Sequence, residues 1–275
     1  MMRVIFSRKG VDSVAGKCAS PLIGERPVSL PIPTRQPSPT TYGQLSPELR
    51  ALAHDLSGGR LSGDQPCHLD PDIDHAALDV RPTGWRGALG QVSSALSHLR
   101  NQHVGVGDLF LFWGLYRRAE RVNAVWRFTG PRRHVMFGWL HVGAVCDIED
   151  DGEGALQRFP WLRDHPHVRP GWQCANAVYV ASDRFTLAGR SFPGSGTFQR
   201  AFQLTEAGSS LPSIWAVPEW LDPMAGGVGM TFHPPDRWLG QGRLRSAARG
   251  QEFVADVTGR ADAERWLADL LEAHA

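Results

Sequence analysis

The sequence has almost no net charge and few cysteines, and each shortage excludes a class of protein. Lys and Arg total 29 and Asp and Glu total 28 in 275 residues, so the formal net charge is +1. A chain with this balance has no overall attraction for a polyanion, and contact with nucleic acid requires a local patch. The four cysteines lack Cys-x-x-Cys spacing, which argues against a disulfide framework and a zinc knuckle. We expect a reducing compartment.

Long apolar runs are also missing. No stretch approaches the roughly 18 apolar residues that a membrane span needs. Charged residues such as Arg3, Arg8 and Lys9 interrupt the first twenty positions, unlike the apolar region of a secretory signal. We therefore expect a soluble, cytoplasmic protein that is not bound to a membrane.

The composition favours a β-rich fold with many turns. Hydrophobic residues make up 42% of the chain, enough for a sizeable core, and there are 30 Gly, 20 Pro and 10 Trp. We expect one α+β domain over residues 1–275, with the Pro-rich loop region 20–43 as part of it. Its centre would be a mixed, mostly antiparallel, aromatic-rich sheet flanked by a few helices.

Apolar periodicity places the expected elements. Helices are predicted at 46–56, 87–104 and 260–275, the first with Ser46 as N-cap and Pro47 at its first position. Strands are predicted at 4–6, 28–33, 107–118, 123–130, 134–145 and 176–182. The strand at 134–145 is expected to be central, because nearly every position is apolar.

Polar chemistry is concentrated directly after the first strand, in "FSRKGVDSVAGKCASP". This loop contains two cations, several hydroxyls and two glycines, which suit a cradle for phosphate or carboxylate; its candidate residues are Ser7, Arg8, Lys9, Gly10, Asp12, Ser13 and Ser20. It matches neither G-x-x-x-x-G-K-[ST] nor G-x-G-x-x-G, so a standard triphosphate pocket is not expected. A serine nucleophile activated by Lys9 and a solvated basic loop remain open alternatives.

The segment "HLDPDID" places His68, Asp70, Asp72 and Asp74 at alternate positions, so they share one face if the chain is extended. This set suits a divalent cation or a general base with an orienting carboxylate. The alternative is an Asp-Pro turn followed by a helix cap.

A second histidine pair occurs in "HPHV", where His165 and His167 are two residues apart. Both imidazoles can then face one ligand, and His68 or Asp70 could join them as further metal ligands. Asn176, at the start of the next strand, is a candidate amide for reading a base edge, or a turn residue.

Aromatic and basic residues share the predicted strands. Trp113 and Trp139 each lie near a glycine and are candidates for stacking an unpaired base, although tryptophan on a strand usually belongs to the core. A basic patch accompanies them, formed by Arg117, Arg118, Arg121, Arg127, Arg132 and Arg133.

Six segments, in order, resemble the third family of nucleotide-modification-associated domains, whose members are described as DNA base hypermodification proteins. They are "MRVIFSRKGVDSVAGKCASPL", "HLDPDID", "GQVSSALSHLRNQHVGVGDLFLFWGLYR", "FGWLHVG", "HPHV" with "NAVYVAS", and "SIWAVPEWLDP". The resemblance covers nearly the whole chain. Besides the loop, His-Asp and His-Pro-His positions above, it implies roles for Gln91, Asn101, Gln102 and Asp108, and His103 stands where the family has glycine.

Three functions follow as hypotheses. In the first, the protein modifies a nucleotide or an extruded DNA base, with Lys9, Asp12, Ser13, His68, Asp70 and Asp72 as catalytic candidates. The other candidates would bind substrate: Ser7, Arg8, Gly10, Ser20, Gln91, Asn101, Gln102, Trp113, Trp139, His165, His167 and Asn176. The second is a reader of modified bases, by analogy with small PUA-like and EVE-like barrels, and the third is a metal-dependent nuclease or hydrolase. Nucleotide or DNA and other base-modification proteins are the expected partners; no cofactor and no definite metal ligand set is assigned.

Overall fold

The computed structural model describes residues 1–36, 38–169, 171–248 and 252–275. Its helices are α1 (Pro47–Ser57), α2 (Ser93–Asn101), α3 (Ile148–Arg158) and α4 (Ala261–His274). The main sheet contains β1 (Arg3–Arg8), β2 (Ser20–Ile23), β3 (Arg26–Pro27), β6 (Ala88–Val92), β7 (Leu109–Val122), β8 (Val125–Asp147), β9 (Asn176–Ala181), β12 (Ser195–Gln203) and β16 (Glu252–Asp256). The small sheets use β4 (Ile32–Pro33), β5 (Cys67–His68), β10 (Arg184–Leu187), β11 (Arg190–Pro193), β13 (Ile214–Ala216), β14 (Trp238–Gly240) and β15 (Arg243–Arg245).

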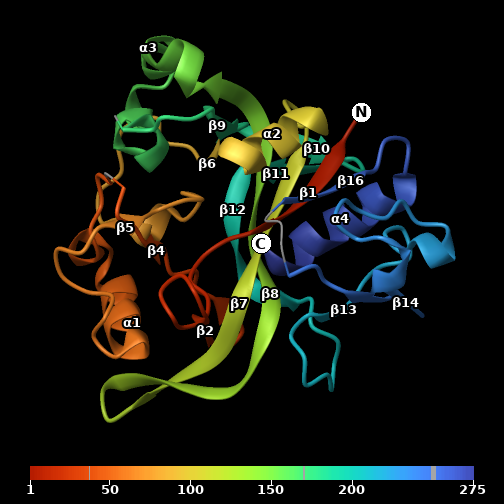
Figure 1. Ribbon diagram of the computed structural model, residues 1–275, viewed down its shortest axis with the longest axis horizontal. Helices are drawn as coiled ribbons and strands as arrows, with labels where there is room; N and C mark the ends of the chain where they lie inside the picture. The colour runs from red at the N-terminus through yellow and green to blue at the C-terminus, as the bar shows by residue number, and fades with distance from the viewer. Residues whose placement is uncertain (37, 170, 249–251) are drawn as a thin grey trace.

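Two long strands form the centre of the main sheet (Figure 1). β8 pairs antiparallel with β7 along one edge and with β12 and then β9 along the other, whereas β1 and β2 run parallel to β7. β16 pairs with β1, which joins the two ends of the chain in one sheet. The expected α+β fold with a mixed, mostly antiparallel sheet is confirmed. Among the described residues the sheet does not close, so the PUA-like barrel is not found.

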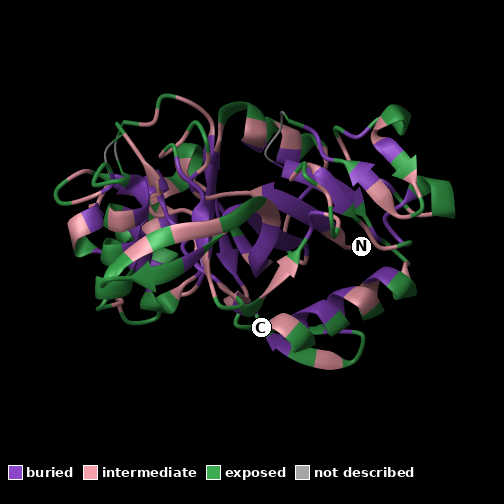
Figure 2. Ribbon diagram, turned by 90° about the horizontal axis from the view of Figure 1, so that it is seen from below, coloured by how far each residue is buried: buried purple, intermediate pink, exposed green. Residues whose placement is uncertain are grey.

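Alternation along the central strands separates two cores. In β1, Val4 and Phe6 pack on one face while Ile5 packs on the other, as period-two geometry requires. The C-terminal helix α4 covers the first face through residues such as Leu267 and Leu271. Helix α2 covers the second face through Leu96 and Leu99. The buried middle of the sheet is visible in Figure 2.

The predicted helix at 87–104 is wrong in its first part. Residues 88–92 form β6, which pairs with β9, and only Ser93–Asn101 is helical. Sheet pairing prevailed over the apolar spacing that Leu89 and Val92 share with the helix. The helix ends in a tight turn although His103 replaces the family's glycine, because His103 itself takes a left-handed conformation at φ 54°.

The predicted strands at 123–130 and 134–145 are parts of one strand, β8. The turn before it has Asn123 and Ala124 at φ 52° and 66°, the two positive values of a type I′ hairpin. A register shift opposite Arg117 and Arg118 accommodates Pro131. β7 and β8 therefore continue past the core as a hairpin arm, defined here as residues 117–133 (Figure 1).

The other predicted elements differ mainly at their ends. The strands at 4–6 and 176–182 and the helices at 46–56 and 260–275 are confirmed as β1, β9, α1 and α4. The expected strand at 28–33 is reduced to Ile32–Pro33, because the two prolines in that stretch, Pro31 and Pro33, have no backbone N–H to donate. In the described part of the chain, no helix combines the length and apolar character needed to cross a bilayer.

Candidate functional site

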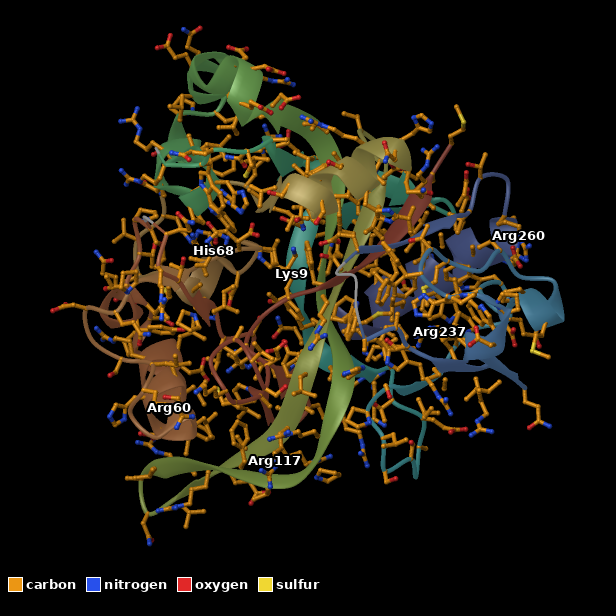
Figure 3. All side chains as sticks on the ribbon, in the orientation of Figure 1. Lys9, Arg60, His68, Arg117, Arg237 and Arg260 are labelled. Carbon is orange, nitrogen blue, oxygen red and sulfur yellow. The ribbon has the colours of Figure 1, made fainter. Side chains whose placement is uncertain are left out.

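Three loops that are far apart in the sequence meet at one cavity of about 440 Å³. The end of β1 supplies Arg8, Lys9, Gly10 and Asp12, and the loop around β5 supplies His68 and Asp70. β6 supplies Gly90 and Gln91, and the turn before β9 supplies His167 and Trp172. His68 and Lys9 lie on opposite sides of this region in Figure 3, near the middle of the molecule.

Two imidazoles and one carboxylate form the centre of the cavity wall. His68 Nε2 lies 3.1 Å from His167 Nε2. Asp70 Oδ2 lies 3.9 Å from the first of these nitrogens and 3.8 Å from the second. All three side chains are largely buried, with exposed fractions of 13%, 5% and 3% for His68, Asp70 and His167. Among the described residues, this is the group whose ligand atoms are close enough together to hold a metal ion.

Buried hydrogen bonds hold the His167 ring in place. Asn176 Nδ2 donates to the His167 carbonyl over 2.7 Å, so the other end of the amide, Oδ1, faces His167 Nδ1 at 2.9 Å. An amide oxygen only accepts, and Nδ1 therefore has the proton. His167 Nε2 is left with its lone pair directed toward His68 and Asp70.

Asp70 is held from its other side. The backbone N–H of Gly90 donates to Asp70 Oδ1 over 2.6 Å. His165 Nε2 lies 3.4 Å from the same oxygen, while His165 Nδ1 accepts from the backbone N–H of His167. Both contacts leave the second carboxylate oxygen facing the two imidazoles. His165 and Asn176 thus lie behind the site and position its side chains.

Burial governs the charge states here. Burial lowers the pKa of His167 to about 3, and it lowers the pKa of His68 against the opposing effect of Asp70. For Asp70, burial alone would raise the pKa, but His165, His167 and Lys9 together outweigh it and the pKa falls. The site at neutral pH consists of neutral imidazoles beside an ionised carboxylate.

Lys9 faces the cavity, and its charge is paired with a buried glutamate. Lys9 Nζ lies 3.1 Å from Glu252 Oε1, which also accepts a hydrogen bond from Gln91 Nε2. The exposed fractions of the Lys9 and Glu252 side chains are 9% and 1%. In the described structure, no hydrogen bond joins Lys9 to Ser7 or Ser13, so the alternative of a serine activated by Lys9 gains no support.

Arg8 and Asp12 form the neighbouring wall. Arg8 Nη2 donates to Asp12 Oδ2 over 2.8 Å, and Asp12 Oδ1 accepts from the backbone N–H groups of Val14 and Ala15. The Arg8 side chain is 29% exposed and has further N–H donors in its planar fork. Gly10, at φ 81°, allows the loop to pass close to Ser29.

Several predicted site residues lie elsewhere. Asp72 forms a bidentate ion pair with Arg81 and accepts a hydrogen bond from the Trp85 indole, and it lines a different cavity from Asp70, so the two carboxylates do not share one face as expected. Asp74 caps a short 3-10 helix, as the alternative reading predicts. The remaining residues are not in the cavity lining: Ser7 and Ser20 are buried, Ser13 and Asn101 are exposed, Gln102 ends α2, and Asp108 accepts from two backbone N–H groups.

The two tryptophans proposed as stacking platforms belong to the core. Trp113 is 1% exposed and packs on Trp215, and Trp139 is 3% exposed and donates to the Pro193 carbonyl. Neither offers a free face to a base, which corrects that prediction. The aromatic residue of the cavity is Trp172, which is half-buried and stacks on His167 with ring centroids 4.8 Å apart.

Three residues of the site were missed from the sequence. Trp172 has the clearest signal, because it lies in a Pro- and Gly-containing loop where a core tryptophan is less expected. Glu252 begins the apolar run "EFVA", where a carboxylate is expected to need a cation if the strand is buried, as it is in the structure. Gly90 has no sequence signal; a Cβ there would lie 2.1 Å from the His167 ring.

The fold is α+β, and its cavity brings together side chains suited to acid–base or metal chemistry beside a half-buried indole. The chain belongs to the family described as nucleotide modification associated domain 3, whose model matches residues 3–256. The resemblance seen in the sequence is thereby confirmed. Searches of curated proteins and of solved structures found no match to the chain.

Proposed function

We propose that this protein modifies a nucleotide base in the cavity between His68, Lys9 and Trp172. The observation that carries the proposal is the convergence of three loops, distant in sequence, on one polar cavity in a member of a nucleotide-modification family. A volume of about 440 Å³ suits one nucleotide and is too small for a duplex. A base in DNA would have to be single-stranded or turned out of its stack.

The cavity offers a role to each of its side chains. The Trp172 ring is the surface on which a base can stack. Arg8 is the cation with N–H donors left for a phosphate or another anionic group. His68 and His167, both neutral, with Asp70 ionised beside them, supply proton transfer or metal coordination at the base.

The hairpin arm favours DNA over a free nucleotide as the substrate. Its arginines are Arg117, Arg118, Arg121, Arg127, Arg132 and Arg133. Within the described part of the chain none of them forms a salt bridge, and most are exposed. Figure 3 shows Arg117 on the arm, away from Lys9 and His68. In a chain of net charge +1, such a group provides the local patch that binding to a polyanion needs.

Binding experiments separate the cavity from the arm. We expect Arg8→Gln to weaken the binding of both a deoxynucleoside monophosphate and a short single-stranded DNA about 10-fold, through loss of a charged hydrogen bond. The double variant Arg121→Gln/Arg127→Gln should leave the monophosphate unaffected. For the DNA it should reduce the slope of log affinity against log salt by about 1.4.

The two variants serve as controls for each other, because each removes arginine charge from a different part of the molecule. Affinities would be measured by fluorescence anisotropy over a range of salt concentrations. If Arg8→Gln bound both ligands as tightly as the unaltered protein, the cavity would not be the nucleotide site. If the arm variant kept the full salt slope, the arm would not contact DNA.

A further inference from the structure

We propose that His68, Asp70 and His167 bind one divalent first-row transition-metal ion. Only the substrate on which such an ion would act, a nucleotide base, is taken from the proposed function. Its own basis is the arrangement of three ligand atoms contributed by two segments nearly a hundred positions apart in the chain.

The spacing of these atoms matches a metal centre without any movement. The triangle formed by His68 Nε2, His167 Nε2 and Asp70 Oδ2 has sides of 3.1, 3.9 and 3.8 Å. The point equidistant from all three corners of such a triangle lies about 2.1 Å from each. Bonds from zinc to imidazole nitrogen are about 2.0–2.1 Å long and those to carboxylate oxygen about 2.0–2.2 Å, so one ion fits at that point.

The hydrogen bonds around the triangle direct its lone pairs inward. Asn176 fixes the proton of His167 on Nδ1, so that Nε2 is the free donor atom. The Gly90 N–H fixes one oxygen of Asp70 and leaves the other for the ion. Partners of this kind, behind the ligands, are what set ring tautomer and orientation in protein metal centres.

A buried atom without a partner supports the same assignment. The His165 side chain is 1% exposed, and its Nε2 has no hydrogen-bond partner among the described residues. It points to Asp70 Oδ1 from 3.4 Å, a distance at which the bond is not formed. Because His165 Nδ1 accepts from the backbone N–H of His167, Nε2 has the proton and faces the Asp70 oxygen that is turned away from the ion, so this imidazole lies behind the carboxylate as an outer partner of the centre.

The ligand set determines the class of ion. Two imidazoles and one carboxylate suit zinc and iron and are a poor match for calcium or magnesium, which prefer oxygen ligands. The alternation Asp70, Asp72, Asp74 would have suited a harder ion, but only Asp70 faces the cavity. Three protein ligands also leave coordination positions for water or substrate.

Titration with Co²⁺ tests the proposal, because its visible absorption reports both stoichiometry and geometry. The full chain, first treated with a chelator, is expected to bind one equivalent. His68→Ala and Asp70→Asn should each weaken binding by more than about 100-fold, and Asn176→Ala, which removes only a partner of His167, by about 10- to 100-fold. His54→Gln is the control, because His54 lies on α1 with 60% of its side chain exposed.

A folded, unaltered protein that bound neither Co²⁺, Zn²⁺ nor Fe²⁺ near one equivalent would overturn the proposal, whatever the variants do. So would a His68→Ala protein, shown by circular dichroism to be folded, that bound Co²⁺ as tightly as the unaltered chain. Nucleotide binding by the chelator-treated protein is measured separately through Arg8→Gln. Failure of the metal proposal and failure of the proposed function therefore give different results.

Discussion

Replacing Gly90 by alanine is expected to disrupt the His68–Asp70–His167 arrangement with a single methyl group. The new Cβ would lie 2.1 Å from two atoms of the His167 ring, a distance that no relaxed structure tolerates. The ring cannot easily move away, because Asn176 holds its Nδ1 and Trp172 stacks on its face. Overpacking of a buried site costs about 1–3 kcal/mol, and here the strain falls on the site itself.

The measurement combines urea denaturation with the imidazole NMR signals of His167. We expect the free energy of unfolding to fall by about 2 kcal/mol and the His167 signals to shift. Gly105→Ala is the matched control, since a Cβ at that position meets nothing within 4 Å. An unchanged His167 spectrum in the Gly90→Ala protein would show that the ring does not occupy this position.

Lys9→Met is expected to be the most destabilising substitution in the cavity. Glu252 would remain buried with the Gln91 amide and without a counter-ion, and its second oxygen already has no hydrogen-bond partner among the described residues. Removing one partner of a buried ion pair typically costs about 3–5 kcal/mol. We expect a loss of that size in the free energy of unfolding, measured by urea denaturation.

Two comparisons make this result specific. Lys17→Met removes an exposed lysine and should change the free energy of unfolding by less than about 0.5 kcal/mol. The double variant Lys9→Met/Glu252→Gln also removes the unpaired charge of Glu252. It should recover at least half of the free energy of unfolding that Lys9→Met loses. A double variant as unstable as Lys9→Met alone would mean that the loss does not come from the unpaired charge of Glu252.

The sequence predicts the local elements of this protein better than their pairing. Caps and apolar spacing identify α1 and α4, and aromatic runs identify β7 and β8. β6 could not be distinguished from the helix that follows it, because its pairing with β9 is set by residues some ninety positions away. Gly130 and Pro131 interrupt the apolar pattern inside β8, so the sequence predicts two strands where the structure has one.

The candidate site shows a similar division. The three loops that contain its residues are recognisable from their polar spacing. His68, Asp70 and His167, which the sequence singles out, all line the cavity. What the sequence does not reveal is which neighbours neutralise one another, because Asp72 pairs with Arg81 and Lys9 with Glu252 only in the folded chain. The choice between Trp113, Trp139 and Trp172 likewise depends on burial.

We propose above that a nucleotide base is changed chemically in the cavity between His68 and His167. The most direct test is mass analysis of nucleosides from DNA of cells that produce the unaltered chain or the Asp70→Asn variant, together with the other proteins of a base-modification system. We expect a nucleoside of new mass in DNA from cells with the unaltered chain and none in DNA from cells with the Asp70→Asn variant. If neither DNA contained a nucleoside of new mass, although the chain bound that DNA with full affinity, the proposed modification would be contradicted. The hypothesis of a reader of modified bases would then remain.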